Sequence, residues 1–199
     1  MTDIQTRRDM VWRTANGPIE APVAKLGGQP FWLDEPFWPT SAGFGTPMMF
    51  IGQFPMPGPH SRLAFLFMAE DGYGTGSTYE PEDGDNALIV QPGGRVPPFL
   101  TGTSARTGPT LWRRGESWTD RVPVELRIDT VPPGGGDSYF GGEPHFWQPS
   151  TRPLGRFFFQ LDGADGAPDE AYALNFGGGT GFAFLSDDGL EGRFCWDCV

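Results

Sequence analysis

A chain of 199 residues with a formal net charge of −11 lacks the basic face that binding to nucleic-acid phosphates or to an anionic membrane surface requires. Its 30 glycines and 21 prolines would be typical of disorder in a polar chain, but 17 phenylalanines and seven tryptophans supply enough apolar area for a folded core. No apolar run has the length of a transmembrane helix and no apolar leader opens the chain, so we expect a cytoplasmic protein. The length of the chain predicts a single domain over residues 1–199.

Short apolar runs bounded by glycine and proline predict strands along most of the chain. In chain order these runs cover residues 47–54, 62–69, 122–129, 155–162, 171–176, 181–186 and 192–198. The run VPVELRID at 122–129 alternates apolar and polar residues, which is typical of a strand with one buried face. Long stretches with helical spacing do not occur. We therefore predict a mainly β fold (α+β with few short helices) built on antiparallel sheets.

One phrase is written nearly twice, as GGQPFWL at residues 27–33 and as GGEPHFW at residues 141–147. Gly-Gly permits a positive φ or a close backbone approach, and the later proline fixes an extended exit from the turn. A glutamine follows an apolar run after each copy, at Gln53 and Gln160. Because a buried amide must find partners, we expect both glutamines to bind open backbone groups.

The similarity continues beyond the doubled phrase. After the two glutamines, Ala64-Phe65-Leu66 aligns with Ala183-Phe184-Leu185. We therefore predict an internal duplication, with two β units at about residues 22–72 and 136–189 that pack around a shared core. The alternative is that aromatic strands and Gly-Pro turns resemble one another without a common origin.

The stretches KLGGQPFW, MMFIGQF and LAFLF, followed by FFFQLD and FAFLSDDGLEGRFCWDC, resemble the YwqG-like proteins over residues 25–198. The resemblance implies a single β-rich fold in a soluble bacterial protein. Some members of that family are encoded near secreted toxins, which implies an immunity (antitoxin-like) role with a toxin as protein partner. The family has no agreed catalytic residues, so none is transferred to this chain. GGGTG at residues 177–181 departs from the aspartate-containing turn that the family pattern predicts.

The sequence contains no recognisable catalytic motif. Both histidines, His60 and His145, lie in proline-rich turns, and GTSAR at residues 102–106 lacks the second glycine of a nucleophile elbow. NFGGGTGF at residues 175–182 leads into a strand-like run, whereas a phosphate-binding loop leads into a helix. Enzymatic activity is left open, but the sequence favours a protein that is not an enzyme.

Cys195 and Cys198 have the CxxC spacing, but a zinc site needs four ligands and the chain has no second pair. Positions three apart on a strand point to opposite faces, which favours incidental thiols over a redox pair. Among the loop carboxylates, Asp162, Asp165 and Asp169 form the candidate set for a weak calcium site. The alternative for these acids is a solvated turn, and no other cofactor is expected.

The segment LWRRGESW, residues 111–118, places Arg113 and Arg114 between Trp112 and Trp118 in an otherwise acidic protein. Exposed tryptophan and arginine are typical of interface hot spots, so these four residues are the candidate partner-binding site. The alternative is that the rings cover the edge of the core while the arginines pair with acids.

These observations favour a non-catalytic protein-binding module, with an immunity protein as its most specific form. One alternative is a module for a small ligand, sugar-like or a cation, that uses aromatic faces and acidic loops. Another is an unrecognised hydrolase that depends on His145 or on a pair of carboxylates.

Overall fold

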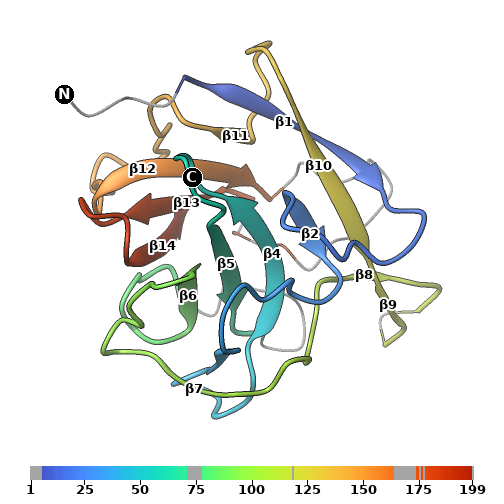
Figure 1. The fold of residues 1–199 in the computed structure, drawn as a ribbon. Coiled ribbons are helices and arrows are strands. Elements are labelled where there is room, and N and C mark those ends of the chain that lie inside the picture. The colour runs from blue at the N-terminus through green and yellow to red at the C-terminus, as the bar shows by residue number, and fades with distance from the viewer. Residues whose placement is uncertain are drawn as a thin grey trace.

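The computed structural model describes residues 6–70, 78–117, 119–163, 174, 176 and 178–198. Within these ranges the chain forms strands, turns and loops (Figure 1). The prediction of a mainly β, antiparallel fold is therefore confirmed, but the few short helices predicted with it are not found in the described ranges. The reason is physical: a helix nucleates at a cost, and the connections rich in glycine and proline are held instead by bonds from buried side chains.

The strands, in chain order, are β1 (Arg8–Thr14), β2 (Lys25–Gly27), β3 (Trp38–Thr40), β4 (Met49–Pro55), β5 (Leu63–Met68), β6 (Asn86–Gln91), β7 (Thr101–Thr103), β8 (Trp112–Arg114), β9 (Arg121–Pro123), β10 (Glu125–Val131), β11 (Tyr139–Phe140), β12 (Arg156–Asp162), β13 (Thr180–Leu185) and β14 (Gly192–Asp197). Ten of them form one sheet in the order β14-β13-β12-β11-β1-β10-β2-β4-β5-β6, while β3 with β7 and β8 with β9 form two small sheets.

One of the predicted strands is divided in the structure, and another falls almost entirely outside the described residues. The run at 122–129 was predicted as one strand but is divided between β9 and β10, because the N–H of Val124 turns aside and donates to the carbonyl of Leu111 at 3.1 Å. The run at 171–176 lies outside the described residues, except for Leu174 and Phe176.

The large sheet curls until its two end strands, β14 and β6, lie beside each other (Figure 1). At one end of this seam a Cβ added to Gly192 would come within 2.5 Å of the carbonyl oxygen of Leu88, so the two strands are in close contact there. Farther along, Trp196 Nε1 donates to the carbonyl of Thr78 at 2.7 Å. The seam is thus closed by packing and by side chains and not by a ladder of backbone hydrogen bonds.

Alternation along the strands gives the curled sheet two apolar faces. The inner face forms the main core, whose buried aromatic residues are Trp112, Phe54, Phe140, Phe158, Phe159, Phe176 and Phe194. Phe65 of β5 faces outward into a second cluster that includes Trp38. Phe182 of β13 and Cys195 of β14 face outward into a third cluster. Both faces of β5 and β13 are therefore buried.

The strand order is symmetric about the centre of the sheet when each strand is matched with a counterpart. Exchanging β1 with β10, β2 with β11, β4 with β12, β5 with β13 and β6 with β14 reproduces every pairing in it. Even the irregularity in β4 between Phe50 and Gly52 recurs in β12 between Phe157 and Phe159. We call the strands β1, β2, β4, β5 and β6 the first half, and β10 to β14 the second half.

This correspondence corrects the alignment made from the sequence. Phe65 lies opposite Gln53, and Phe182 lies opposite Gln160, so Phe65 corresponds to Phe182. The alignment of Ala64 with Ala183 is therefore wrong by two residues, an error that leaves each side chain on the correct face of its strand. The unit limits at 22–72 and 136–189 and the single domain stay predictions. The correspondence extends beyond those limits, because it also includes β1, β6, β10 and β14.

Gln53 is fully buried in β4 and binds three backbone groups of the first half. Its Oε1 accepts the N–H of Phe31 at 2.9 Å. Its Nε2 donates to the carbonyls of Ala21 and Val23 at 2.8 and 2.9 Å. One side chain thereby fixes both segments that flank β2, because an amide is a donor and an acceptor at once.

Gln160 takes the corresponding place in β12 and is 3% exposed. Its Oε1 accepts the N–H of His145 at 3.0 Å, and its Nε2 donates to the carbonyl of Asp137 at 2.7 Å. The prediction that both amides bind open backbone groups is confirmed. Two of the three partners of Gln53 have counterparts here, and the third has none among the residues described.

The doubled Gly-Gly has the same backbone conformation in both halves. The φ angles are 66° and 63° in Gly27-Gly28 and 64° and 72° in Gly141-Gly142. These left-handed values favour glycine and turn the chain back over the sheet. Trp32 then packs with its ring centroid 5.0 Å from a phenylalanine of β5, and Phe146 packs 4.8 Å from one of β13.

We expect Gln53→Leu to cost more stability than Gln160→Leu, because three backbone groups lose their partner in the first variant and two in the second. At about 1–3 kcal/mol for each buried group left unsatisfied, the free energy of unfolding should fall by at least roughly 3 kcal/mol in the first variant and at least roughly 2 kcal/mol in the second. Urea unfolding followed by tryptophan fluorescence measures both. Losses below about 1 kcal/mol in both variants would show that the amides do not hold the loops.

A buried carboxylate joins the two halves. Asp9 of β1 accepts the N–H groups of Gly134 and Gly136 at 2.7 and 3.0 Å and the Nε–H of Arg7 at 2.9 Å. Burial by itself would raise the pKa of Asp9, but the bonds from the two glycines and from Arg7 outweigh it and hold the pKa at about 2, below the usual 3.8.

Because the pKa of Asp9 is lower in the folded chain than in the unfolded one, its carboxylate stabilises the fold above about pH 4, and this contribution is lost as the pH falls from about 4 to about 2. We expect Asp9→Asn to be less stable than the wild type at pH 7, with a difference that shrinks as the pH falls through this window. Urea unfolding across the window measures the effect, with the exposed Glu35→Gln as control. A difference that does not change with pH would contradict the assignment.

Candidate functional site

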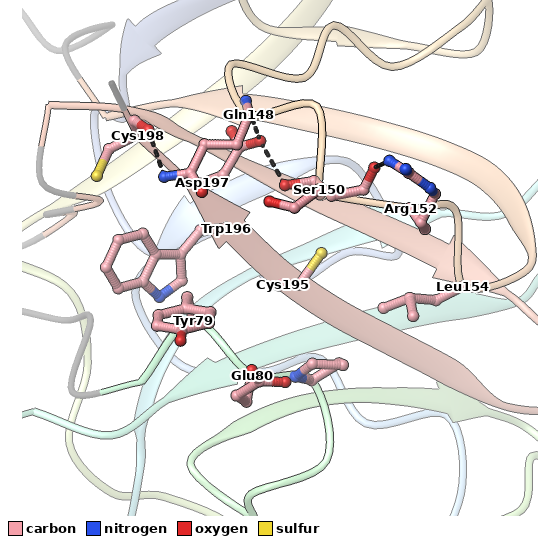
Figure 2. A pocket seen from close by; sticks show the side chains of 12 residues that line it. Tyr79, Glu80, Gln148, Ser150, Arg152, Leu154, Cys195, Trp196, Asp197 and Cys198 are labelled. Atoms are coloured by element: carbon pink, nitrogen blue, oxygen red, sulfur yellow. Dashed lines mark hydrogen bonds between the residues drawn. The ribbon is translucent and has the colours of Figure 1, made fainter.

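A pocket of about 670 Å³ opens beside β14, the last strand of the sheet (Figure 2). Three segments that are far apart in the sequence line it: residues 79–81 before β6, residues between Gln148 and Leu154 before β12, and Cys195–Cys198 at the end of the chain. The curl of the sheet brings the approach to β6 against β14, and this contact creates the pocket.

Cys195 lies in the part of β14 that the pocket exposes between its two walls (Figure 2). The thiol is buried, and burial together with the carboxylates of Asp197 and Glu80 raises its pKa to about 12. It therefore stays protonated near neutral pH and is a poor nucleophile. Cys195 and Cys198 are free cysteines, and Figure 2 shows their sulfur atoms pointing in different directions.

Asp197 fixes one wall of the pocket. Its Oδ2 accepts the N–H groups of Trp147 and Gln148, both at 3.2 Å, and the hydroxyl of Thr151 at 2.8 Å. Gln148 Nε2 also donates to the carbonyl of Cys198 at 2.8 Å (Figure 2). These four bonds hold the turn before β12 over the end of β14, so this wall is already in place without a ligand.

The opposite wall carries aromatic rings and a free acid. Tyr79 is 59% exposed, and its ring stands at 87° to that of Trp196 with 6.0 Å between centroids. Trp196 is held by its bond to the backbone before β6. The neighbouring Glu80 is exposed, and its carboxylate has no ion-pair partner in the part of the chain that the structure describes. Two perpendicular ring faces beside a carboxylate suit a cationic group.

The rim of the pocket is partly apolar. Leu154, which is 38% exposed, and Arg152 come from the wall opposite Tyr79 (Figure 2). Leu154 and Arg152 belong to no motif in the sequence, and the CxxC spacing of Cys195 and Cys198 does not indicate a pocket. Only the acidic run from Tyr79 to Asp85 stands out locally, as a candidate solvated loop.

The structure describes three of the four residues predicted to bind a partner. Trp112 is only 9% exposed, belongs to the main core and is covered by the guanidinium of Arg121, 4.6 Å from its ring centroid. This placement favours the alternative in which the ring covers the edge of the core. Arg113 and Arg114 are half-buried in β8, and Trp118 lies outside the described residues.

The structure describes one of the three residues predicted to form a calcium site. Asp162 is half-buried at the end of β12, whereas Asp165 and Asp169 lie outside the described ranges. Across those ranges, no group of three or more His, Cys, Asp or Glu side chains is placed to hold a metal ion.

No described segment forms a helix with the length and apolar character needed to cross a membrane.

We expect iodoacetamide at pH 8 to modify Cys198 much faster than Cys195, because the Cys195 thiol is buried and its pKa is raised to about 12. Peptide mass spectrometry of the alkylated protein measures both rates. Adding urea should remove the difference, which serves as the internal control. Equal rates in the folded protein would contradict the description of Cys195 as a protonated, buried thiol.

Comparison with known proteins identifies no relative of this chain. No protein-family model, no curated protein and no solved structure matches the chain. The YwqG-like resemblance therefore stays a prediction from the residues that carry it, and the function has to be inferred from the geometry of the site.

Proposed function

We propose that this protein is a non-catalytic module that binds a protein partner, and that the pocket beside β14 receives a basic side chain of that partner. The observation that carries the proposal is the perpendicular pair of Tyr79 and Trp196 with the carboxylate of Glu80 next to it. A lysine or arginine placed there would meet two ring faces and an opposite charge.

The surroundings of the pocket support a protein as the source of that side chain. Tyr79 and Leu154 expose large apolar surface on opposite rims, and a partner would cover both when its side chain enters between them. The net charge of −11 would steer a basic partner toward the module. The mixture of apolar rim and acidic wall is therefore suited to a basic protein surface.

Binding is also better supported than reaction chemistry at this pocket. Cys195 would be the natural nucleophile, but its raised pKa keeps it protonated. Oδ2 of Asp197 accepts three hydrogen bonds that hold the pocket wall, and its Oδ1 is buried. Both groups serve the shape of the pocket, which supports a role in recognition.

The class of partner that we propose is a toxin with a basic surface, which the module neutralises by covering it. The acidic charge and the YwqG-like resemblance support this finer proposal. An immunity protein needs no chemistry of its own, since blocking the partner's surface is sufficient.

The test is capture of proteins encoded beside the gene of this chain, using the wild type, Tyr79→Ala and Glu80→Gln as baits. We expect one such protein to bind the wild type, with affinity that falls as salt rises, and to bind either variant at least about tenfold more weakly. Phe44→Ala and Glu116→Gln, which alter exposed residues elsewhere, should bind like the wild type.

Thermal unfolding shows whether each bait is folded. A partner that binds Tyr79→Ala and Glu80→Gln as tightly as the wild type would overturn the assignment of the pocket. A wild type that captures none of the neighbouring proteins and gives no protection from their toxicity would overturn the immunity role.

A further inference from the structure

The correspondence between the halves points to a second site, separate from the pocket beside β14. Ten residues connect β1 to β2 in the first half, whereas seven connect β10 to β11 in the second. The longer connection passes over Gln53, which binds its carbonyl at Ala21. Where the shorter connection passes Gln160, a cavity of about 240 Å³ remains.

In the first half the same space is occupied by the chain itself. The N–H of Ile19 donates to Glu125 at 3.0 Å, and the carbonyl of Ile19 accepts from the buried ammonium of Lys25 at 3.0 Å. Lys25 and Glu125 also form an ion pair at 2.6 Å. The first half thus shows what fills this position: a piece of polar backbone held by side-chain donors and acceptors.

Five of the ten residues that line the cavity differ from their counterparts in the same direction. The strand registers and the side-chain bonds of Gln53, Gln91, Gln160 and Asp197 pair the residues of the two halves. Five positions that are apolar in the first half carry side chains capable of hydrogen bonding in the second, namely Val23/Asp137, Phe31/His145, Leu33/Trp147, Pro55/Asp162 and Leu63/Thr180. All five second-half residues line the cavity. Five such differences directed at one small space indicate a polar occupant.

Gln160 supplies the clearest need for that occupant. Gln53 uses both N–H bonds of its amide, on Val23 and Ala21. Gln160 lines the cavity, is 3% exposed and uses one N–H, on Asp137, while the other has no partner within the described ranges. A buried donor without a partner costs about 1–3 kcal/mol, so an oxygen acceptor in the cavity would be stabilised.

The charges at the cavity disfavour an anion as that occupant. The guanidinium of Arg7 is already bound by Asp9 at 2.9 Å and by the carbonyl of Gly136 at 2.5 Å, and it lies 3.7 Å from the ring centroid of Tyr139. The carboxylate of Asp137 faces solvent at the cavity and would repel a negative charge. It would instead accept hydrogen bonds from hydroxyl groups.

Aromatic rings complete the lining. Trp147 is 45% exposed, and its Nε1 is fixed to the hydroxyl of Thr180 at 3.0 Å. His145 stands at 82° to Trp147 with 5.7 Å between the ring centroids. Rings of this kind offer apolar faces to C–H groups while nearby acids and amides bind oxygen atoms.

We propose that this cavity binds a small neutral polyhydroxylated ligand of monosaccharide size. A ligand oxygen accepts the unpaired N–H of Gln160, ligand hydroxyls form hydrogen bonds with Asp137 and with the imidazole of His145, and the C–H face of the ligand lies against Trp147. A volume of about 240 Å³ is below the range of roughly 300–1,000 Å³ that drug-sized ligands occupy, and it matches a ligand that places a single ring in the site.

The test uses the full ¹⁵N-labelled chain, titrated into the millimolar range with D-glucose, D-galactose, D-mannose and N-acetyl-D-glucosamine. We expect at least one sugar to move the side-chain amide signals of Gln160. The variants are Asp137→Val and His145→Phe, which introduce the first-half residues at exposed positions. Each should weaken that sugar at least about tenfold, since each removes a polar contact worth about 1.4 kcal/mol or more. Glu116→Val, a matched change at a distant exposed acid, should bind like the wild type.

Three results would overturn the proposal. The first is that no sugar in the panel moves the signals of Gln160. The second is that both variants bind the sugar as the wild type does. The third is that sodium acetate or methylamine moves those signals while the sugars do not. The site and the pocket beside β14 have no tested residue in common, so the outcome is independent of the binding of a protein partner.

Discussion

Two buried amides, Gln53 and Gln160, set the constraint on which the remainder of the structure depends. A loop that folds back over a curled sheet carries backbone N–H and C=O groups out of water, and each group must find a partner. A single amide supplies both kinds of partner, so each glutamine joins the segment before its Gly-Gly turn to the segment after it. With those loops in place, aromatic residues can cover the outer faces of β5 and β13.

The two halves share this frame but differ in what covers it. Ile89 of β6 and Cys195 of β14 are counterparts, because they lie opposite Phe65 and Phe182. Ile89 is enclosed in a cluster with Trp38 and other aromatic residues, whereas Cys195 lies at the pocket beside β14. The space above the glutamine is likewise filled in the first half and open in the second. Both proposed sites therefore lie where the two halves are covered by different segments.

Local features of the fold could be predicted from the sequence, and features that depend on distant segments could not. The longer apolar strands and the structural role of Gln53 and Gln160 follow from short patterns, because their causes lie within a few residues. β2, β3, β7 and β11 have two or three residues each, too few to show an alternation. Trp112 looked exposed beside its arginines, but Arg121 of β9 and the main core cover it. The pocket beside β14 is built from three separate segments, which only the curl of the sheet brings together.

Amide hydrogen exchange at Phe31 and His145 tests the central claim most directly, because each N–H belongs to a loop and donates to a buried glutamine. Exchange resolved by NMR under native conditions should show both amides protected as strongly as those of β5 and β13, since they open only when the fold around the glutamines opens. Exchange at the rates of exposed loop amides at either position would contradict the account.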